Sequence, residues 1–422
     1  MKIKFIDYSK VEDIIRNYTK KIDLSIKIPD EEILNRHQKV QSILNAHGID
    51  IGIFFWYHEM PEDGIYLTGY NPTIERAAGL IMKKGFPIIL AGPEAGKLAY
   101  EASKGQNVKV YFVKEFSIPG EYYEGINYHS LREIIKENVY GPIKRVGLLT
   151  SLEIFPSALL DIFKKAFNKG VEFVDSSDIL REQRYEKSES EFACMAQANK
   201  IASAAARAML SILKPGLRES QVAAVGDFVM KSLGADGYGF ETIVNSGSRC
   251  RTIIGPASNK IINEGEIVQI GCSPSYEGYK GVLRRTIILG KPTRRQSEFM
   301  RILRDAYLQA EEALKEVVRK NLNVNKIDLA ARNYFSKYEI DGFNMKEFHA
   351  YSSAHGTGLT ECLEPMVVGP DTNSKYGYRV GIILDIGCYG HPNDEIAGGC
   401  IENAFGKDGE NLLSWSLDIP VI

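Results

Sequence analysis

A histidine at position 355 and a glutamate at position 402 are the residues whose types and surroundings best suit proton-transfer chemistry. His355 opens the segment HGTGLTE (355–361), whose glycines let the backbone approach closely while the imidazole points inward. Imidazole exchanges protons near neutral pH, and a buried carboxylate such as Glu402 has a raised pKa or an arginine partner. We therefore expect both residues to be catalytic; the alternative for His355 is a hydrogen-bonded core histidine.

Two of the six cysteines lie close in sequence to these residues. Cys400 stands two residues before Glu402, so strand alternation puts both on one face, and Cys362 follows His355 by seven residues. Either thiol could contact a substrate, and a nucleophilic thiol would need its pKa lowered by a neighbouring cation. The alternative is a buried small hydrophobic residue. The other cysteines of the C-terminal half, whose roles the sequence leaves open, are Cys250, Cys272 and Cys388. Strand alternation predicts that Cys272 and Cys388 point away from the site.

These residues belong to the second of two predicted domains. The 422 residues exceed what one hydrophobic core usually supports. Residues 1–183 alternate short strands with helices, which predicts a smaller α/β domain. Ser188, with Glu191 three positions on, forms a capping-box pattern that opens a long helix, so the second domain is predicted to be 184–422.

Strand and helix patterns in the second domain predict how the site is held. Strands are predicted over 240–247, 265–279, 282–290, 381–390 and 398–406, and helices over 294–320 and 325–338. We expect the helices to lie outside a curved antiparallel sheet, which is an α+β architecture.

Composition excludes several partners. Charged residues make up 25% of the chain and are interspersed, with a net charge of −2, so no electrostatic footprint for nucleic acid is present. The N-terminus lacks a secretory h-region, and no apolar run approaches the roughly 18 residues that span a bilayer. We expect a cytoplasmic protein with free thiols and no membrane partner.

The order of motifs in the second domain resembles the pita-bread catalytic domain shared by creatinase, prolidase, aminopeptidase P and methionine aminopeptidase. The first domain resembles the N-terminal domain of the longer members of this group, with YLTGYNP at 66–72. The motifs are specific in combination. The resemblance implies a homodimer in which one chain's N-terminal domain closes over its neighbour's site. The motifs of the second domain are KPG (214–216), FETIVNSG (240–247), GY (278–279), RT (285–286), HGTGL (355–359) and IE (401–402).

In the peptidases that the chain resembles, two Asp, one His and two Glu bind a pair of divalent ions. On that pattern the two Asp fall on Gly271 and Val282 and the first Glu falls on Gly387, whereas His355 and Glu402 keep the remaining ligand types. Two ligands cannot hold a dinuclear site, and losing three carboxylates removes the charge that favours cations. We therefore expect no metal, with creatinase as the metal-free precedent.

Arg284 and Asp385 are expected to fill the vacated space. Arg284 shares its strand face with the second lost Asp position, so its guanidinium could bind a substrate carboxylate or polarise a carbonyl. Asp385 lies two residues before Gly387 on the same face and could supply a displaced carboxylate. The alternatives are an arginine paired with a nearby acid and a solvent-facing Asp. Arg251 and Tyr279 are predicted to line the mouth of the site.

The predicted function is metal-independent, creatinase-like cleavage of a C–N bond in a small amino-acid-like, amide or amidine compound, by a hydrolase or lyase. His355 and Glu402 would act as acid and base, and Arg284 as an anion clamp. Two alternatives stay open: an Xaa-Pro aminopeptidase or dipeptidase whose ligands are misaligned here, and an inactive relative that binds a ligand or partner. No fingerprint of an organic cofactor is present. Acids that would supply ligands to the peptidase are Glu361, Glu364, Asp385, Asp394 and Glu395.

Overall fold

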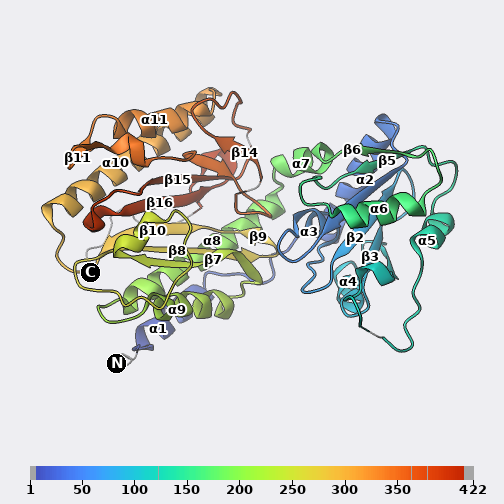
Figure 1. The fold of residues 1–422 in the computed structure, drawn as a ribbon, viewed down its shortest axis with the longest axis horizontal. Coiled ribbons are helices and arrows are strands. Elements are labelled where there is room, and N and C mark those ends of the chain that lie inside the picture. Colours follow the sequence, from blue (N-terminus) through green and yellow to red (C-terminus); the bar gives the residue numbers. More distant parts are fainter. Residues whose placement is uncertain (1–5, 122, 363, 378, 413–422) are drawn as a thin grey trace. The chain divides into compact units, whose positions relative to one another are not determined.

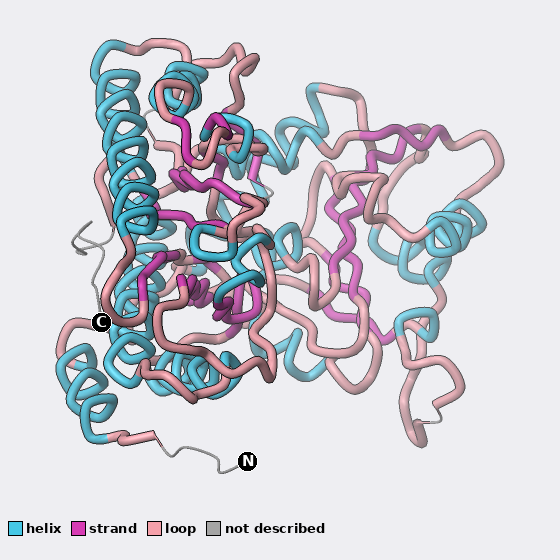
Figure 2. Tube along the Cα trace, turned by 60° about the vertical axis from the view of Figure 1, so that its left-hand side comes forward, coloured by secondary structure: helices cyan, strands magenta, loops and turns pink. Residues whose placement is uncertain are grey.

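The computed structural model describes residues 6–121, 123–362, 364–377 and 379–412. The chain divides into two compact units, one of Ile28–Arg184 and one of Met1–Lys27 with Tyr185–Ile422. In both units the strands gather into a sheet that helices flank (Figure 2).

The Ile28–Arg184 unit is an α/β domain built on a six-stranded mixed sheet of order β4-β3-β2-β1-β5-β6. β1 pairs antiparallel with β2 and parallel with β5, and β2 pairs antiparallel with β3. Buried aliphatic and aromatic side chains of the strands, with those of α5 and α6, form its core. Its strands are β1 (Ile51–Trp56), β2 (Ala77–Met82), β3 (Ile88–Ala91), β4 (Lys109–Phe112), β5 (Arg145–Leu148) and β6 (Glu172–Asp175). Its helices are α2 (Asp30–Ala46), α3 (Glu62–Thr68), α4 (Gly96–Ala102), the short η1 (Lys114–Phe116), α5 (Leu131–Asn138), α6 (Ser157–Ala166) and α7 (Asp178–Tyr185, which ends at the boundary).

The larger unit is built on an antiparallel sheet of order β14-β13-β15-β16-β10-β8-β7, with β9 pairing β8 (Figure 1). Its strands are β7 (Gly237–Ser246), β8 (Ile267–Tyr276), β9 (Tyr279–Lys280), β10 (Leu283–Ile288), β13 (Ala354–Gly356), β14 (Glu364–Val368), β15 (Ile382–Tyr389) and β16 (Gly398–Phe405). A separate pair is β11 (Glu339–Ile340) and β12 (Phe343–Asn344). Its helices are α1 (Ser9–Thr19), α8 (Glu189–Ile212), α9 (Glu219–Ser232), α10 (Arg294–Lys320) and α11 (Asn325–Phe335), with the short η2 (Gly247–Arg251), η3 (Met345–Phe348), η4 (Asp394–Ile396) and η5 (Lys407–Gly409).

Local signals explain why the larger unit forms these elements. Ser188 accepts a hydrogen bond from the Glu191 N–H while the Glu191 side chain caps the Ser188 N–H, so the predicted capping box opens α8. α8 packs against β8, and α10 packs against β15 and β16. The predicted α+β architecture is confirmed.

Strand alternation sorts the side chains of this sheet onto two faces. Cys272 contacts the Ala202 carbonyl of α8, and Cys388 lies in the core cluster beneath α10, so both thiols lie on the helix-covered face. The prediction that they point away from the site is confirmed. Residues one position away along the strands, such as Gly271 and Gly387, lie on the opposite face, which carries the polar site.

The first 27 residues differ from the expected domain of 1–183. α1 buries Val11 and Tyr18, and the Tyr18 hydroxyl accepts a hydrogen bond of 3.0 Å from Arg207 Nε of α8. The Tyr276 hydroxyl donates to the Ile26 carbonyl at 2.9 Å. These contacts join the N-terminal segment to the larger unit. An amphipathic pattern shows that a helix has a buried face but not which domain covers it.

Among the described residues, no helix combines the length and apolar character needed to cross a bilayer.

Candidate functional site

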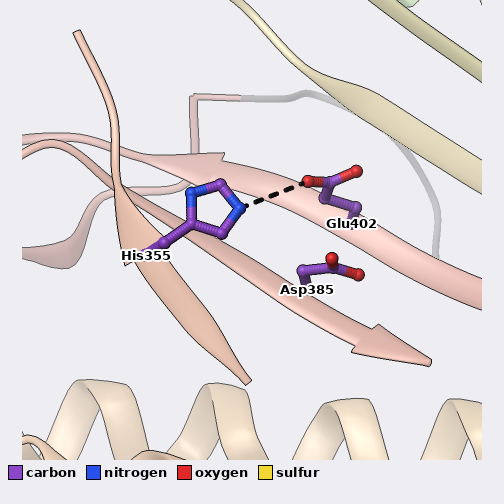
Figure 3. A group of neighbouring side chains, drawn as sticks. All are labelled: His355, Asp385 and Glu402. Atoms are coloured by element: carbon purple, nitrogen blue, oxygen red, sulfur yellow. Dashed lines mark ion pairs between the residues drawn. The ribbon is translucent and has the colours of Figure 1, made fainter. Parts of the chain in front are cut away.

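Three ligand-type side chains converge on the open face of the antiparallel sheet. His355 comes from β13, Asp385 from β15 and Glu402 from β16, which are three consecutive strands of the sheet. Asp385 and Glu402 stand directly opposite each other in the β15–β16 register. One ligand atom from each of the three residues lies within 4.8 Å of the others (Figure 3). The hydrogen-bonded pairing of these strands, rather than a loop, therefore fixes the positions of the three side chains.

The His355 imidazole lies between two glutamates. Its Nε2 is 3.8 Å from Glu402 Oε1 and 3.7 Å from Glu361 Oε1. These separations are too long for direct hydrogen bonds. Glu402 is almost fully buried, and its Oε2 has no hydrogen-bond partner among the residues that the structure describes. Burying a carboxylate oxygen without a hydrogen bond costs free energy. The site therefore favours a bound group that contacts this oxygen.

Arg284 brings a buried positive charge to the same face. It stands opposite Glu402 in the β10–β16 register and opposite Gly271 in the β10–β8 register. Its Nε lies 3.6 Å from Glu402 Oε2, and its Nη1 lies 3.7 Å from Asp385 Oδ2. The prediction that Arg284 projects into this space agrees with its position, and its guanidinium lies against two of the protein's own acids.

Charge and burial oppose each other in this cluster. Burial and then the charge of Asp385 raise the pKa of Glu402 well above its usual range, although Arg284 acts in the other direction. Burial disfavours the charged form of Arg284, but the neighbouring Cys400, Tyr389 and acids together raise the pKa of its guanidinium. The guanidinium is therefore a permanent cation.

Asp385, not Gly387, supplies the carboxylate of β15. A Cβ placed on Gly387 would overlap the Tyr351 hydroxyl, so Tyr351 occupies the volume in which a side chain at 387 would lie. The same hydroxyl donates a hydrogen bond of 2.9 Å to Asp385 Oδ1. Gly387 therefore carries no ligand, and the position of Asp385 agrees with the prediction that it supplies a displaced carboxylate. Tyr351 orients this acid.

The positions of the two missing Asp cannot supply ligands. A Cβ on Gly271 would lie 2.8 Å from Arg284 Cγ, so the arginine stem fills that space. Val282 is fully buried and packs with Ile383 and Ala404 in a small apolar cluster. A pair of ions therefore does not fit this chain. A single divalent ion fits the donor set of one imidazole and two carboxylates on His355, Asp385 and Glu402.

Four further predicted residues have other surroundings. Cys400 is buried on the site face beside Glu402, and Cys362 is exposed close to Glu361. The Tyr279 hydroxyl is buried and donates to Glu191 of α8 at 3.0 Å. Arg251 binds the His391 carbonyl at 3.0 Å. Tyr279 is thus held in the interior, whereas Arg251, with 33% of its side chain exposed, pairs with Asp394 at 2.6 Å. These contacts give both residues structural partners and do not place either at the mouth of the site.

A nucleophilic thiol is not supported. Burial, followed by the charge of Glu361, raises the pKa of Cys362 to about 12, and burial raises the pKa of Cys400 well above its usual range. Both shifts are opposite to the lowering that thiolate catalysis needs.

Cys362 provides a direct test of this conclusion. In the folded protein, we expect Cys362 to be the one of the six cysteines that reacts with iodoacetamide, because the other five are buried. Only the thiolate reacts, so the rate should rise about tenfold per pH unit throughout the range below pH 12. Mass spectrometry after timed alkylation between pH 7 and 10 would measure this. A plateau near pH 8 would contradict the raised pKa, and Cys362→Ser is the matched control.

Two known protein families match the sequence of this chain. The sequence pattern of Metallopeptidase family M24 matches residues 193–403, and that of the Creatinase/Prolidase N-terminal domain matches residues 36–185. The chain belongs to metallopeptidase family M24. The expected pita-bread domain, preceded by a creatinase-type N-terminal domain, is thereby confirmed.

Relatives in the M24 family cover most of the chain. The Xaa-Pro dipeptidase of Pyrococcus horikoshii is 31% identical over 295 residues, which are 70% of this chain and 74% of that relative. The Xaa-Pro dipeptidase of Pyrococcus furiosus is 29% identical over 325 residues, 77% of this chain and 82% of that relative. The solved prolidase of Pyrococcus horikoshii OT3 has a TM-score of 0.75 at 25% identity and covers 92% of this chain. All of that prolidase chain is covered.

Membership of the M24 metallopeptidases contradicts the metal-independent prediction. The similar proteins are Xaa-Pro dipeptidases, whereas the prediction rested on the loss of three carboxylates, at Gly271, Val282 and Gly387. With Asp385 included, His355 and Glu402 have a third ligand-type partner. Asp385, predicted to contact substrate, therefore belongs with the ligand-type residues.

Sequence reasoning missed two contributors to the M24 site. Glu361 was noted only as a nearby acid, although it follows His355 by six residues within the same glycine-rich motif. Tyr351 gave no signal, because it precedes His355 in an irregular segment and reaches Asp385 only in the folded sheet. Tertiary packing alone reveals such a partner.

Proposed function

We propose that this chain hydrolyses the peptide bond before proline in short Xaa-Pro peptides, with one divalent ion held by His355, Asp385 and Glu402. The observation that carries the proposal is the convergence of these three ligand-type atoms within 4.8 Å on three adjacent strands. It is supported by the 31% identity to an Xaa-Pro dipeptidase over 70% of the chain. A bound divalent ion would polarise the scissile carbonyl and acidify a water molecule.

The side chains of the site would divide the remaining tasks. Tyr351 and Arg284 hold Asp385 in place, at 2.9 Å and 3.7 Å respectively. Glu361 stands beside His355 Nε2 at 3.7 Å, with 11% of its side chain exposed. Its Oε1 is therefore placed to accept a proton from an incoming water and to return it to the leaving nitrogen. Burial excludes bulk water from the other carboxylates, which strengthens their electrostatic effect.

The experiment compares two dipeptides that differ in one residue. Purified protein incubated with Mn²⁺ is expected to release alanine from Ala-Pro at least about tenfold faster than from Ala-Ala, because the family's relatives are named for Xaa-Pro bonds. His355→Ala should lose the activity, and His47→Ala, which changes an exposed histidine at the end of α2, should retain it. Absence of cleavage in Mn²⁺-bound protein would contradict the proposal and favour a relative that binds without catalysis. The homodimer implied by the resemblance stays a prediction.

A further inference from the structure

Arg284 occupies space that two-ion members of the family leave for ligands. Its stem crosses Gly271, where even a Cβ would lie 2.8 Å from Arg284 Cγ. Beside it, Val282, Ile383 and Ala404 close the neighbouring volume with apolar side chains. The loss of the Asp side chain at position 271 and the presence of Arg284 therefore depend on each other, because only a glycine at position 271 leaves room for the arginine stem.

Contacts with the protein fix the guanidinium of Arg284. Its Nη2 donates to the Tyr389 hydroxyl at 2.6 Å and to the carbonyl oxygen of Ile253, and it lies 3.5 Å from Gln269 Oε1. Only 2% of the Arg284 side chain is exposed. An arginine held in this way is a fixed part of the site, and a substrate cannot readily displace its partners.

The other two nitrogens of the Arg284 guanidinium, Nε and Nη1, face the ligand-type acids. Nε lies 3.6 Å from Glu402 and Nη1 lies 3.7 Å from Asp385, and within the described part of the chain Nε makes no hydrogen bond. Arg284 therefore already places a fixed positive charge against two of the carboxylates that would bind ions. A second divalent ion beside the guanidinium would be repelled by this charge, and the arginine stem fills the space over Gly271.

We propose that Arg284 replaces the second metal ion with a permanent protein cation, so that the site takes one divalent ion where the peptidases it resembles take two. This inference rests on the proposed function for the first ion only. Arg284 is a positioning residue: it neutralises and orients Asp385 and Glu402 and leaves one position for an ion beside His355. Because guanidinium does not lose its proton in proteins, this half of the site stays charged at every working pH.

The main test counts ions in a reconstructed site. Wild-type protein loaded with Mn²⁺ and dialysed is expected to retain one Mn²⁺ per chain by elemental analysis, with the electron paramagnetic resonance spectrum of an isolated ion. The triple variant Gly271→Asp, Val282→Asp, Arg284→Ala restores two carboxylates and clears the arginine stem. It is expected to retain two Mn²⁺ per chain with a spin-coupled spectrum. Two ions, or none, in the wild type would overturn the proposal, as would one ion in a folded triple variant.

Single substitutions keep the proposal testable if the triple variant does not fold. Arg284→Gln removes the cation and keeps a polar side chain, so we expect its Kd for Mn²⁺ to fall at least about tenfold, because like-charge repulsion is lost. Arg284→Lys retains the charge and should bind Mn²⁺ as the wild type does. A purely structural role would weaken binding in both variants, and that result would overturn the proposal.

The two proposals fail separately. Wild-type protein with one Mn²⁺ and no cleavage of Ala-Pro would remove the proposed function and leave the role of Arg284 standing. Cleavage of Ala-Pro by protein that holds two Mn²⁺ would remove the role of Arg284 and leave the proposed function standing.

Discussion

Glu402→Gln is expected to lower kcat/KM for Ala-Pro by at least about 100-fold. The glutamine keeps the shape of the side chain but removes the charge that faces both His355, at 3.8 Å, and Arg284, at 3.6 Å. It also removes one of the three ligand-type residues. Steady-state assays at saturating Mn²⁺, together with Mn²⁺ titration by calorimetry, would measure the loss of turnover and of ion affinity.

The matched control for Glu402→Gln is Glu395→Gln. Glu395 makes an ion pair with Arg295 at 2.9 Å, and its side chain is 42% exposed, so it belongs to the surface rather than to the site. The same chemical change there should leave both measurements unaltered. Full activity of Glu402→Gln, with circular dichroism matching the wild type, would remove Glu402 from the reaction.

Asp328→Ala is expected to lower the free energy of unfolding by about 3–5 kcal/mol. Asp328 is fully buried in α11 and accepts hydrogen bonds from the Ser353 N–H and hydroxyl at 3.0 and 2.8 Å. It also pairs with Arg332 Nε at 2.5 Å, and Arg332 binds the Tyr351 carbonyl at 2.7 Å. The alanine would leave a partly buried guanidinium and two buried Ser353 donors without their acceptor. Urea unfolding followed by circular dichroism would measure the loss.

The consequence of Asp328→Ala for the site is also specific. The Ser353 carbonyl accepts the Asp385 N–H at 2.9 Å, so the Asp328 anchor holds the segment that leads into His355 against the strand of Asp385. Asp328→Asn keeps an acceptor for Ser353 and should lose less stability than the alanine. Glu316→Ala, which removes an exposed pair with Lys320, should cause no measurable change. Equal free energies of unfolding for Asp328→Ala and Glu316→Ala would contradict the conclusion that Asp328 anchors this segment.

Local patterns were sufficient to predict most of the fold. The helix predicted over 294–320 is α10 (Arg294–Lys320), and the predicted strands 381–390 and 398–406 are β15 and β16 within two residues. Alternation also placed Cys272 and Cys388 away from the site. These features depend on periodicity along one segment, which a single sequence contains in full.

The site was predicted less completely, because its geometry depends on register between strands. His355, Glu402 and Arg284 were placed on the correct face. Periodicity put Gly387 and Asp385 on that same face and left two possibilities open for Asp385, a displaced carboxylate and a solvent-facing side chain. The cross-strand pairing of Asp385 with Glu402 decides between them. Tyr279 was misplaced for the same reason, since strand alternation does not reveal that Glu191 of α8 receives its hydroxyl.

The sequence by itself determined the two domains, the family resemblance, the loss of the two Asp ligands at Gly271 and Val282, and the residues that could do proton-transfer chemistry. Only the tertiary structure decided that Asp385 completes a three-residue ligand set, that Arg284 fills the space over Gly271, and that residues 1–27 join the larger unit. The physical reason is that residue type and spacing are local properties. Charge balance, occluded volume and hydrogen-bond partners are set by segments far apart in the chain that meet only when the sheet closes.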